Sequence, residues 1–129
     1  MSQSKLIQCP CESGRTYQDC CAPLHNGAHA SSAEALMRSR YTAYVLALEN
    51  YLLDTWHPTT RPQALNLHED HAVKWLGLQI KRTETNAIEN TAIVEFIARY
   101  RSGSGKASRM HEISQFERLD RWYYLNAVS

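Results

Sequence analysis

The sequence has little of what several large functional classes require. Nowhere does it run for the roughly 20 apolar residues of a membrane-spanning helix, and its first residues lack the apolar region of a secretory signal. Its charges nearly cancel, with 14 basic and 13 acidic side chains and a net charge of +1. Neither DNA nor an anionic membrane is therefore indicated as a partner. We expect a cytoplasmic protein.

Cysteine is also scarce, and its placement is uneven. The chain has only four cysteines in 129 residues, and with 43% hydrophobic residues it can build a core without a disulfide scaffold. All four, Cys9, Cys11, Cys20 and Cys21, lie near the N-terminus. They form one local cluster, and the length suits a single domain with a small appendage.

Helical signals come first along the chain. Ser31 and Glu34 have the spacing of a capping box, which predicts the start of a helix. Apolar residues then recur at steps of three and four and predict one stripe that faces the core: Ala33, Leu36, Met37, Tyr41, Tyr44, Val45 and Leu48. Shorter helices are predicted over residues 49–56, which end before Pro58, and over residues 61–71.

Strand signals follow the helices. Residues that are β-branched or aromatic concentrate in four segments, 74–84, 91–101, 106–119 and 121–128, which predict strands. The connections between the last three segments, such as residues 102–105, are short enough to be hairpin turns, so an antiparallel meander is expected. Helices followed by strands indicate an α+β fold.

The cysteines form two close pairs, separated by a loop with a tight turn at Ser13 and Gly14. Four thiolates that converge from two neighbouring segments make a tetrahedral sulfur site, which suits Zn²⁺. Two disulfides, four ordinary thiols or a redox pair are the alternatives, although neither close pair has the Cys-x-x-Cys spacing of redox motifs. His25 and His29 are further candidate ligands if one cysteine does not bind.

Residues 9–21, here called the knuckle, read Cys-Pro-Cys-x-Ser-Gly-x-x-Tyr-x-x-Cys-Cys. This pattern resembles the SEC-C motif at the C-terminus of the SecA translocation ATPase and in small bacterial proteins. The resemblance implies zinc bound by Cys9, Cys11, Cys20 and Cys21. Because the tail of SecA contacts SecB and ribosomes, it also implies a protein or ribosome partner. Glu12 stands where the motif usually has glycine, which concerns the backbone more than the metal ligands.

Five further strings are similar to the YchJ family of bacterial proteins, and together they extend over nearly the whole chain. They are Leu36-Met-Arg-Ser-Arg-Tyr41, Tyr51-Leu-x-x-Thr-Trp-His57-Pro58, Trp75-Leu-Gly-Leu78, Val94-x-Phe-x-Ala-Arg99-Tyr100 and Trp122-Tyr-Tyr124. This resemblance implies a cone-shaped fold like that of nuclear transport factor 2, and it supplies no activity. We predict a SEC-C zinc-binding motif over residues 1–24. A nuclear-transport-factor-2-like α+β domain, with helices packed on a curved antiparallel sheet, is predicted over residues 31–129.

A curved sheet that wraps a helix can leave a pocket, and the third predicted strand supplies side chains for it. Alternation places Glu112, Ser114 and Phe116 on one face, so a carboxylate can project into an apolar concavity. Burial there would raise its pKa and suit it to proton transfer. Glu112 and His57 are the candidate acid and base, and Tyr44 is a candidate hydrogen-bond donor.

Structural interpretations compete with these assignments. Glu112 can instead pair with Arg38 or Arg40, because pairs of this kind commonly tie a helix to a sheet. His57 can cap a helix end. The aromatic residues at core-like spacings are expected to be packing residues: Tyr41, Tyr44, Trp75, Phe96 and Trp122. His68 and His71 would share a helix face and form a second metal candidate, but without a third ligand a solvated helix end is the alternative.

We therefore favour a zinc-binding protein whose knuckle is a structural or docking element, rather than an enzyme. The rival hypothesis is an enzyme or small-ligand carrier that uses Glu112, Ser114 and His57 in the pocket. A closed four-cysteine site beside a filled pocket would favour docking. An open cavity with an unpaired Glu112 would favour chemistry.

Overall fold

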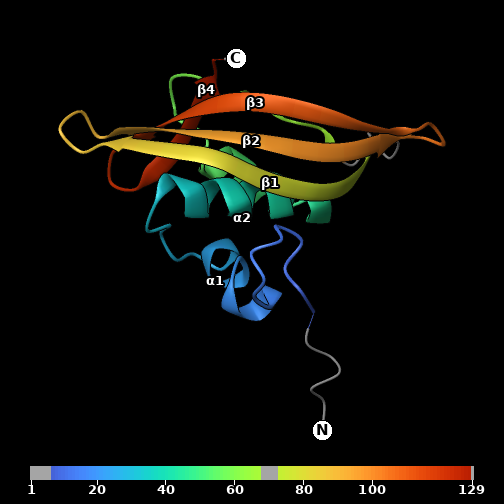
Figure 1. The fold of residues 1–129 in the computed structure, drawn as a ribbon. Helices are drawn as coiled ribbons and strands as arrows, with labels where there is room; N and C mark the ends of the chain where they lie inside the picture. The colour runs from blue at the N-terminus through green and yellow to red at the C-terminus, as the bar shows by residue number, and fades with distance from the viewer. Residues whose placement is uncertain (1–6, 68–72, 129) are drawn as a thin grey trace, which may run out of the picture.

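The computed structural model describes residues 7–67 and 73–128, and its elements lie in three layers (Figure 1). The first layer is a four-stranded antiparallel sheet. Helix α2 (Ala33–Leu46) crosses its inner face and is followed by the short helix α3 (Glu49–Asp54). The knuckle and the short helix α1 (Ala22–His25) form the third layer, on the far side of α2. Helix α2 is therefore covered from two sides.

The sheet is a meander in the order β1-β2-β3-β4. Its strands are β1 (Val73–Asn86), β2 (Thr91–Ser102), β3 (Ala107–Arg118) and β4 (Trp122–Ala127). These bounds agree closely with the four predicted segments, and the predicted α+β fold with a curved antiparallel sheet is confirmed. Register shifts interrupt the pairing of β1 with β2 after Trp75 and after Ile80. Such bulges add twist and bend the strand, which helps the sheet to curve around α2.

Helix α2 begins one residue later than its sequence predicts. The cap is Ser32 rather than Ser31, and its hydroxyl oxygen accepts a hydrogen bond of 3.1 Å from the amide of Ala35. Glu34 does not complete a capping box; its carboxylate pairs with Arg38 one turn later, at 3.1 Å. Arg38 also donates to the carbonyl of Cys11, so this pair lies on the side of α2 that faces the knuckle.

Burial on α2 is not confined to one stripe. Its buried residues are Ala33, Leu36, Met37, Ser39, Arg40, Tyr41, Thr42 and Ala43. Val45, which belongs to the predicted stripe, is 36% exposed. Three polar side chains, Ser39, Arg40 and Thr42, are buried because the knuckle and α3 cover the faces that the sheet does not. Each of them needs a hydrogen-bond partner, and these partners mark the sites described below.

The helix predicted over residues 61–71 is wrong for its described part, which ends at Leu67. That part is irregular, with no helix of a full turn. The amides of Leu65 and Leu67 donate to the carboxylate of Glu49 at 3.1 and 3.0 Å. These two amides are thus bound to α3 instead of to carbonyls of their own segment, which explains why the weak apolar stripe does not form a helix.

The chain between α3 and this loop runs beside β4. The amide of His57 donates to the carbonyl of Tyr124 at 2.7 Å, and the amide of Tyr124 donates to the carbonyl of Thr55 at 2.9 Å. Trp56 and Tyr124 form a parallel bridge. This short pairing fixes the end of α3 against the sheet and so helps to close one end of the space under α2.

One core joins the sheet, α2 and the knuckle. The four cysteines pack in the same cluster of buried residues as Leu36 of α2 and Val94 and Phe116 of the sheet. Of the aromatic residues predicted to pack, Tyr41, Phe96 and Trp122 are buried, and Tyr44 and Trp75 are half-buried. Within the described ranges, no helix has both the length and the apolar character that a membrane crossing needs.

Candidate functional site

The four cysteine sulfurs converge between the knuckle and α2. Their Sγ atoms all lie within 4.8 Å of one another, and no cysteine is more than 8% exposed. The sulfur of Cys20 lies 3.6 Å from that of Cys11 and 3.9 Å from that of Cys21. A disulfide needs about 2.0 Å, and all four thiols are free. The predicted single cluster is confirmed, and it could hold one metal ion.

A tight hairpin brings the first pair of cysteines to the second. The amide of Cys9 donates to the carbonyl of Arg15 at 2.9 Å, across a loop in which Gly14 has φ +90°. Glu12 has φ +63°, in the left-handed region where a side chain is strained and glycine is not. Its carboxylate lies 3.5 Å from the guanidinium of Arg99 on β2. The departure from the motif's glycine therefore falls at a position where glycine has a conformational advantage.

Thr42, in the middle of α2, connects the helix to the cysteine cluster. Its side chain is completely buried, and its hydroxyl oxygen lies 3.4 Å from the sulfur of Cys21 and 3.7 Å from that of Cys9. The thiol of Cys21 donates the first of these hydrogen bonds. A metal-bound thiolate would instead accept from the hydroxyl, which has one proton to give, and such hydrogen bonds orient metal ligands and tune their affinity. Thr42 thus contacts two of the four sulfurs from the helix side.

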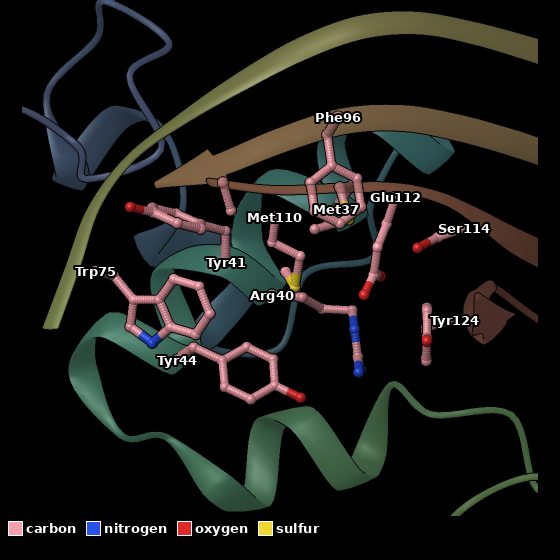
Figure 2. Close-up of a pocket in the computed structure, with 11 residues that line it drawn as sticks. Met37, Arg40, Tyr41, Tyr44, Trp75, Phe96, Met110, Glu112, Ser114 and Tyr124 are labelled. Atoms are coloured by element: carbon pink, nitrogen blue, oxygen red, sulfur yellow. The ribbon is translucent and has the colours of Figure 1, made fainter. Parts of the chain in front are cut away.

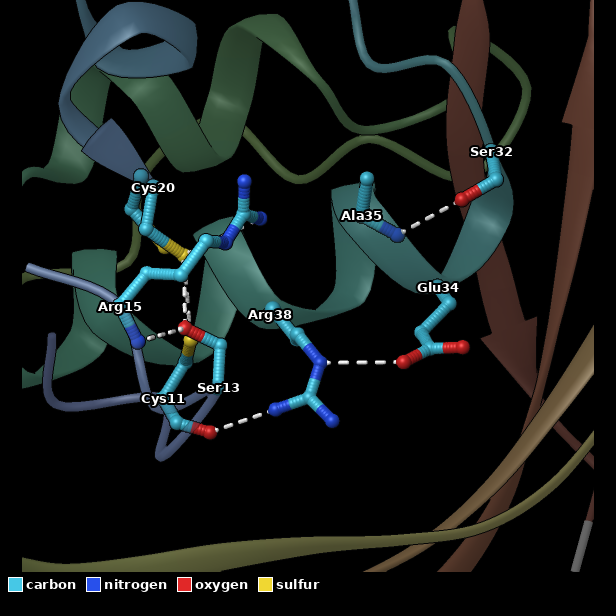
Figure 3. A network of polar contacts seen from close by, with 9 residues as sticks. Cys11, Ser13, Arg15, Cys20, Ser32, Glu34, Ala35 and Arg38 are labelled. Carbon is cyan, nitrogen blue, oxygen red and sulfur yellow. Dashed lines mark hydrogen bonds and ion pairs between the residues drawn. The ribbon is translucent and has the colours of Figure 1, made fainter. Parts of the chain in front are cut away.

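A third sulfur is held from within the knuckle (Figure 3). The hydroxyl of Ser13 lies 3.1 Å from the sulfur of Cys20 and accepts a hydrogen bond of 3.2 Å from the amide of Arg15. Its own proton is therefore free to be donated to the sulfur. The guanidinium of Arg15 also approaches Cys20, at 3.7 Å. Donors and positive charge around a sulfur favour the thiolate, which is the form that binds metals.

Arg38 of α2 binds the backbone of the knuckle (Figure 3). Its Nη1 donates to the carbonyl of Cys11 at 2.7 Å, and its Nε donates to the carboxylate of Glu34 at 3.1 Å. Glu34 thereby orients the guanidinium toward the knuckle. The turn between the first two cysteines is fixed to the helix independently of any metal.

His25, a candidate ligand, does not belong to the cluster. Its Nδ1 lies 2.7 Å from the hydroxyl of Tyr17, and its Nε2 lies 2.9 Å from the carbonyl of Ser39, to which it donates. The hydroxyl of Ser39 is in turn 2.6 Å from that of Tyr51 on α3. Burial lowers the pKa of His25. Both ring nitrogens are engaged, so this histidine joins three helices rather than binding a metal. His29 is exposed.

Without a metal, the cysteines do not titrate alike. The hydrogen bond from the thiol of Cys21 is the main cause that lowers the pKa of Cys11 to about 4. The same bond, together with burial, raises the pKa of Cys21, and burial raises that of Cys20. Cys11 is thus a thiolate beside the thiols of Cys20 and Cys21. A bound divalent cation would displace their protons, because metal-bound cysteines are thiolates.

A cavity of about 280 Å³ lies on the other side of α2, against the inner face of the sheet (Figure 2). Aromatic and methionine side chains form most of its wall. The side chains with polar groups that line it include Arg40, Tyr41 and Tyr44 of α2, Glu112 and Ser114 of β3, and Tyr124 of β4. Figure 2 shows the polar ends of Arg40, Tyr44 and Glu112 turned toward the same part of the cavity.

Arg40 is a buried cation, only 3% exposed. Its Nη1 donates to the carbonyl of Leu52 at 2.8 Å and to the hydroxyl of Thr55 at 2.7 Å. Its guanidinium carbon lies 5.0 Å from the centre of the Trp56 ring and 4.5 Å from that of Tyr124. No carboxylate of the described residues lies within ion-pair distance of it. Burial lowers the pKa of Arg40 to about 10, which leaves it protonated at neutral pH.

Glu112 faces this cavity unpaired. The ion pair expected with Arg38 or Arg40 is not formed, because Arg38 binds Glu34 and Arg40 binds α3. Burial raises the pKa of Glu112, and no other group in the described structure offsets that effect. Ser114, the second predicted pocket residue, is buried and lines the same cavity.

His57 lies outside the cavity and is not brought to Glu112. Its Nδ1 accepts a hydrogen bond of 3.2 Å from the amide of Thr59, so Nε2 carries the proton. That nitrogen lies 2.6 Å from the carboxylate of Glu117, to which it donates. His57 therefore fixes a turn to β3; it neither pairs with Glu112 nor caps a helix. The other predicted histidine pair, His68 and His71, lies outside the described residues.

Two family models match the chain. The one described as "YchJ, middle NTF2-like domain" matches residues 32–127, and the SEC-C motif matches residues 8–23. The chain belongs to the YchJ family. A UPF0225 protein of Chromobacterium violaceum is 52% identical over 124 residues, which cover 93% of this chain and 91% of that protein. A UPF0225 protein of Xanthomonas oryzae is 52% identical over 120 residues, or 92% of each chain.

Two solved structures of SEC-C motif proteins share this fold. The solution structure of such a protein from Rhodopseudomonas palustris has a TM-score of 0.85 and 38% identity, and the match covers 95% of this chain and 98% of the other. A crystal structure of one from Psychrobacter arcticus has a TM-score of 0.77 and 29% identity, with 92% and 80% covered. The resemblances to the YchJ family and to the SEC-C motif are thus confirmed.

Sequence reasoning missed how this YchJ chain connects its two sites. Thr42 and Arg38 lie on α2 and were not connected with the cysteines, which are more than 15 residues away in the chain. One signal was present: Thr42 interrupts an apolar stretch between Tyr41 and Ala43, where a buried hydroxyl requires a partner. Arg40 was considered only as an ion-pair partner, and its true partners, a carbonyl and a hydroxyl, leave no pattern in the sequence.

Proposed function

We propose that this protein binds one zinc ion through Cys9, Cys11, Cys20 and Cys21, and that the ion is structural. The observation that carries the proposal is the convergence of four buried sulfurs within 4.8 Å. A tetrahedron of sulfurs at about 2.3 Å from Zn²⁺ has edges of about 3.8 Å. The sulfur separations of 3.6 and 3.9 Å lie on either side of that value.

A site of four cysteines leaves no open coordination position for a substrate or a catalytic water, which is typical of structural zinc. The ion would join the two ends of the knuckle and complete the layer that covers α2. Thr42 and Arg38 support this role, because they bind the knuckle's sulfurs and backbone from the helix.

Metal analysis of protein purified under reducing conditions tests the zinc proposal. We expect one zinc per chain in the wild type and none in a Cys20→Ser, Cys21→Ser variant. A Ser104→Ala variant, altered in the distant β2–β3 turn, is the control and should keep its zinc. Wild-type protein that holds no metal, or a metal other than zinc, would contradict the proposal.

We further propose that the outer side of the knuckle docks a protein partner. The likeness to the SEC-C motif supports this, and so does the exposure of Glu12, Arg15, Gln18 and Asp19. Four thiolates and one Zn²⁺ carry two negative charges, whereas the carboxylates of Glu12 and Asp19 are balanced by Arg15 and by Arg99, which lies 3.5 Å from Glu12. Such a surface repels the phosphates of ribosomal RNA and favours a basic protein surface.

Charge reversal tests the docking proposal without touching the metal ligands. A partner is first identified by crosslinking in cells, and its binding to purified zinc-loaded protein is then measured. Asp19→Lys should weaken binding, whereas Glu89→Lys in the exposed β1–β2 turn should not. Equal binding by both variants, or co-sedimentation with protein-free ribosomal RNA that Asp19→Lys strengthens, would contradict the docking proposal and leave the zinc site unaffected.

A further inference from the structure

The cavity between α2 and the sheet contains a cation and an anion that do not neutralise each other. Arg40 is almost fully buried and has no carboxylate within ion-pair distance among the described residues. Glu112 lines the same cavity and pairs with neither of the arginines predicted for it. Buried charges are normally paired, because the loss of hydration is otherwise not compensated.

A purely structural role does not explain Arg40. Its two hydrogen bonds to α3 use only Nη1, and a neutral donor could make them. The rings of Trp56 and Tyr124 attract the guanidinium but do not neutralise it. The positive charge is thus kept in a low-dielectric wall at a cost that a bound anion would remove.

The rest of the cavity indicates what carries that anion. Its wall is mainly aromatic and apolar, which favours a molecule with an apolar body. Its volume of about 280 Å³ lies just below the usual range of ligand pockets, about 300–1,000 Å³, so the ligand must be small. Glu112 accepts hydrogen bonds when ionised, so a complementary ligand also brings a donor.

We infer that the cavity binds a small apolar amino acid or hydroxy acid. Its carboxylate pairs with Arg40, and its ammonium or hydroxyl group donates to Glu112. The body of the ligand packs against the aromatic wall formed by Trp75 and Phe96. A molecule of this class compensates both charges at once, whereas a molecule with only one of the two groups leaves the other charge buried and unpaired.

Four compounds with the same phenyl ring separate these contributions. L-phenylalanine has both groups, 3-phenyllactate replaces the ammonium with a hydroxyl, 3-phenylpropanoate has only the carboxylate, and phenethylamine has only the ammonium. Binding to zinc-loaded wild-type protein is followed by amide chemical shifts in a ¹⁵N–¹H spectrum. We expect shifts at cavity residues such as Phe96 and Ser114. Each single-group compound should bind at least about tenfold more weakly, the loss that follows when a charged group keeps no hydrogen-bond partner.

Variants of Glu112 and Arg40 then test which side chain binds which group of the ligand. Glu112→Gln should weaken L-phenylalanine and leave 3-phenylpropanoate nearly unchanged, while Arg40→Lys should weaken both. Because Arg40 also binds α3, its variant can fail to fold; the ligand series and Glu112→Gln are then sufficient. Glu95→Gln, the same change on the opposite face of the sheet, is the control and should bind like the wild type.

Two results would overturn this inference. One is the absence of shifts at cavity residues with all four compounds at millimolar concentration. The other is equal binding of all four, which would make the cavity a site for the phenyl ring alone. In either case the zinc site would stand, since none of these measurements depends on it.

Discussion

Helix α2 has polar side chains on both its covered faces, but the two faces satisfy them differently. On the knuckle side, Thr42 contacts two sulfurs, Arg38 binds a carbonyl and a carboxylate, and Ser39 accepts from His25 through its backbone. On the cavity side, Arg40 has no counter-ion and Glu112 has no partner in the described structure. The same helix therefore borders a region that the protein itself completes and a region that it does not.

The difference separates a structural site from a binding site. Polar groups that hydrogen-bond to one another stabilise the folded structure, and a ligand that binds there gains little free energy from them. Polar groups held without partners in an apolar cavity cost stability, and a protein recovers that cost only when a ligand binds. A closed cysteine cluster and an open cavity with an unpaired Glu112 had been expected to favour different functions. The molecule has both, one on each side of α2.

Removing the metal should have the largest effect, because the knuckle covers α2. Chelation should lower the free energy of unfolding by on the order of 10 kcal/mol, since the binding energy of a structural zinc is folding energy. We expect the loss to reach the whole domain, because the cysteines share one core with the sheet. Denaturant unfolding with and without a strong chelator measures it. Unchanged stability after complete zinc removal would show that the knuckle does not support the domain.

The next largest effect should come from Thr42→Val, which we expect to weaken zinc binding. The change keeps the shape of the side chain and removes the hydroxyl that lies 3.4 Å from Cys21 and 3.7 Å from Cys9. Loss of such an outer hydrogen bond typically lowers metal affinity by about 10- to 100-fold. Competition with a zinc-binding dye gives the affinity. Thr42→Ser keeps the hydroxyl and should remain close to the wild type; equal losses in both variants would point to packing rather than to the hydrogen bond.

The backbone of the knuckle offers a smaller test at Glu12. Because this residue has φ +63°, Glu12→Gly should relieve strain, whereas Glu12→Ala keeps the strain and removes only the carboxylate. We expect the glycine variant to be more stable than the alanine variant by about 1 kcal/mol. The exposed ion pair between Glu12 and Arg99, which both variants lack, should contribute little to stability. Thermal melts of the two zinc-loaded variants decide the matter, and a less stable glycine variant would refute the strain.

Glu112→Gln should have the smallest effect on the free energy of unfolding. Removal of this unpaired charge on the cavity side should stabilise the protein, whereas the changes that remove the metal or Thr42's hydroxyl on the knuckle side weaken it. The folded state raises the pKa of Glu112 above the ordinary value of 4.5. Between the ordinary pKa and the raised pKa of the folded state, the folded protein binds more protons than the unfolded chain. The free energy of unfolding therefore falls as pH rises through that window. The variant should therefore be more stable than the wild type at neutral pH, by no more than about 1 kcal/mol because solvent screens the group.

Melts of both proteins from pH 4 to pH 7 measure this difference. The gap should widen as pH rises and then stay constant. A Glu112→Gln variant that is destabilised at neutral pH would mean that the carboxylate has a stabilising partner, as an ion pair between helix and sheet would provide.

Much of the fold was predictable because its signals are local. Concentrations of β-branched and aromatic residues predicted the four strands to within two residues at each end, and the close spacing of the cysteines predicted that they cluster. The prediction of a helix over residues 61–71 was wrong for a non-local reason: the carboxylate of Glu49, on α3, accepts hydrogen bonds from the amides of Leu65 and Leu67. Helix α1 was missed because its four residues are too few for a periodic signal.

The site was predictable only in part, for a related reason. The ligand set of cysteines lies within the knuckle, but its support comes from Thr42 and Arg38 across the fold. In the cavity, alternation along β3 placed Glu112 and Ser114 together. It could not show that the Nη1 of Arg40 binds the carbonyl of Leu52, nor that His57 binds Glu117 instead of lining the cavity. Pairings between distant elements depend on tertiary geometry that no spacing records.

X-ray absorption at the zinc edge of the purified protein tests the division between the two sides of α2 most directly. A closed structural site predicts four sulfur neighbours at about 2.3 Å and no nitrogen or oxygen ligand. The spectrum should not change when L-phenylalanine is added, because that ligand is assigned to the cavity. A site with fewer than four sulfurs, or an oxygen or nitrogen ligand that appears on addition of L-phenylalanine, would contradict it.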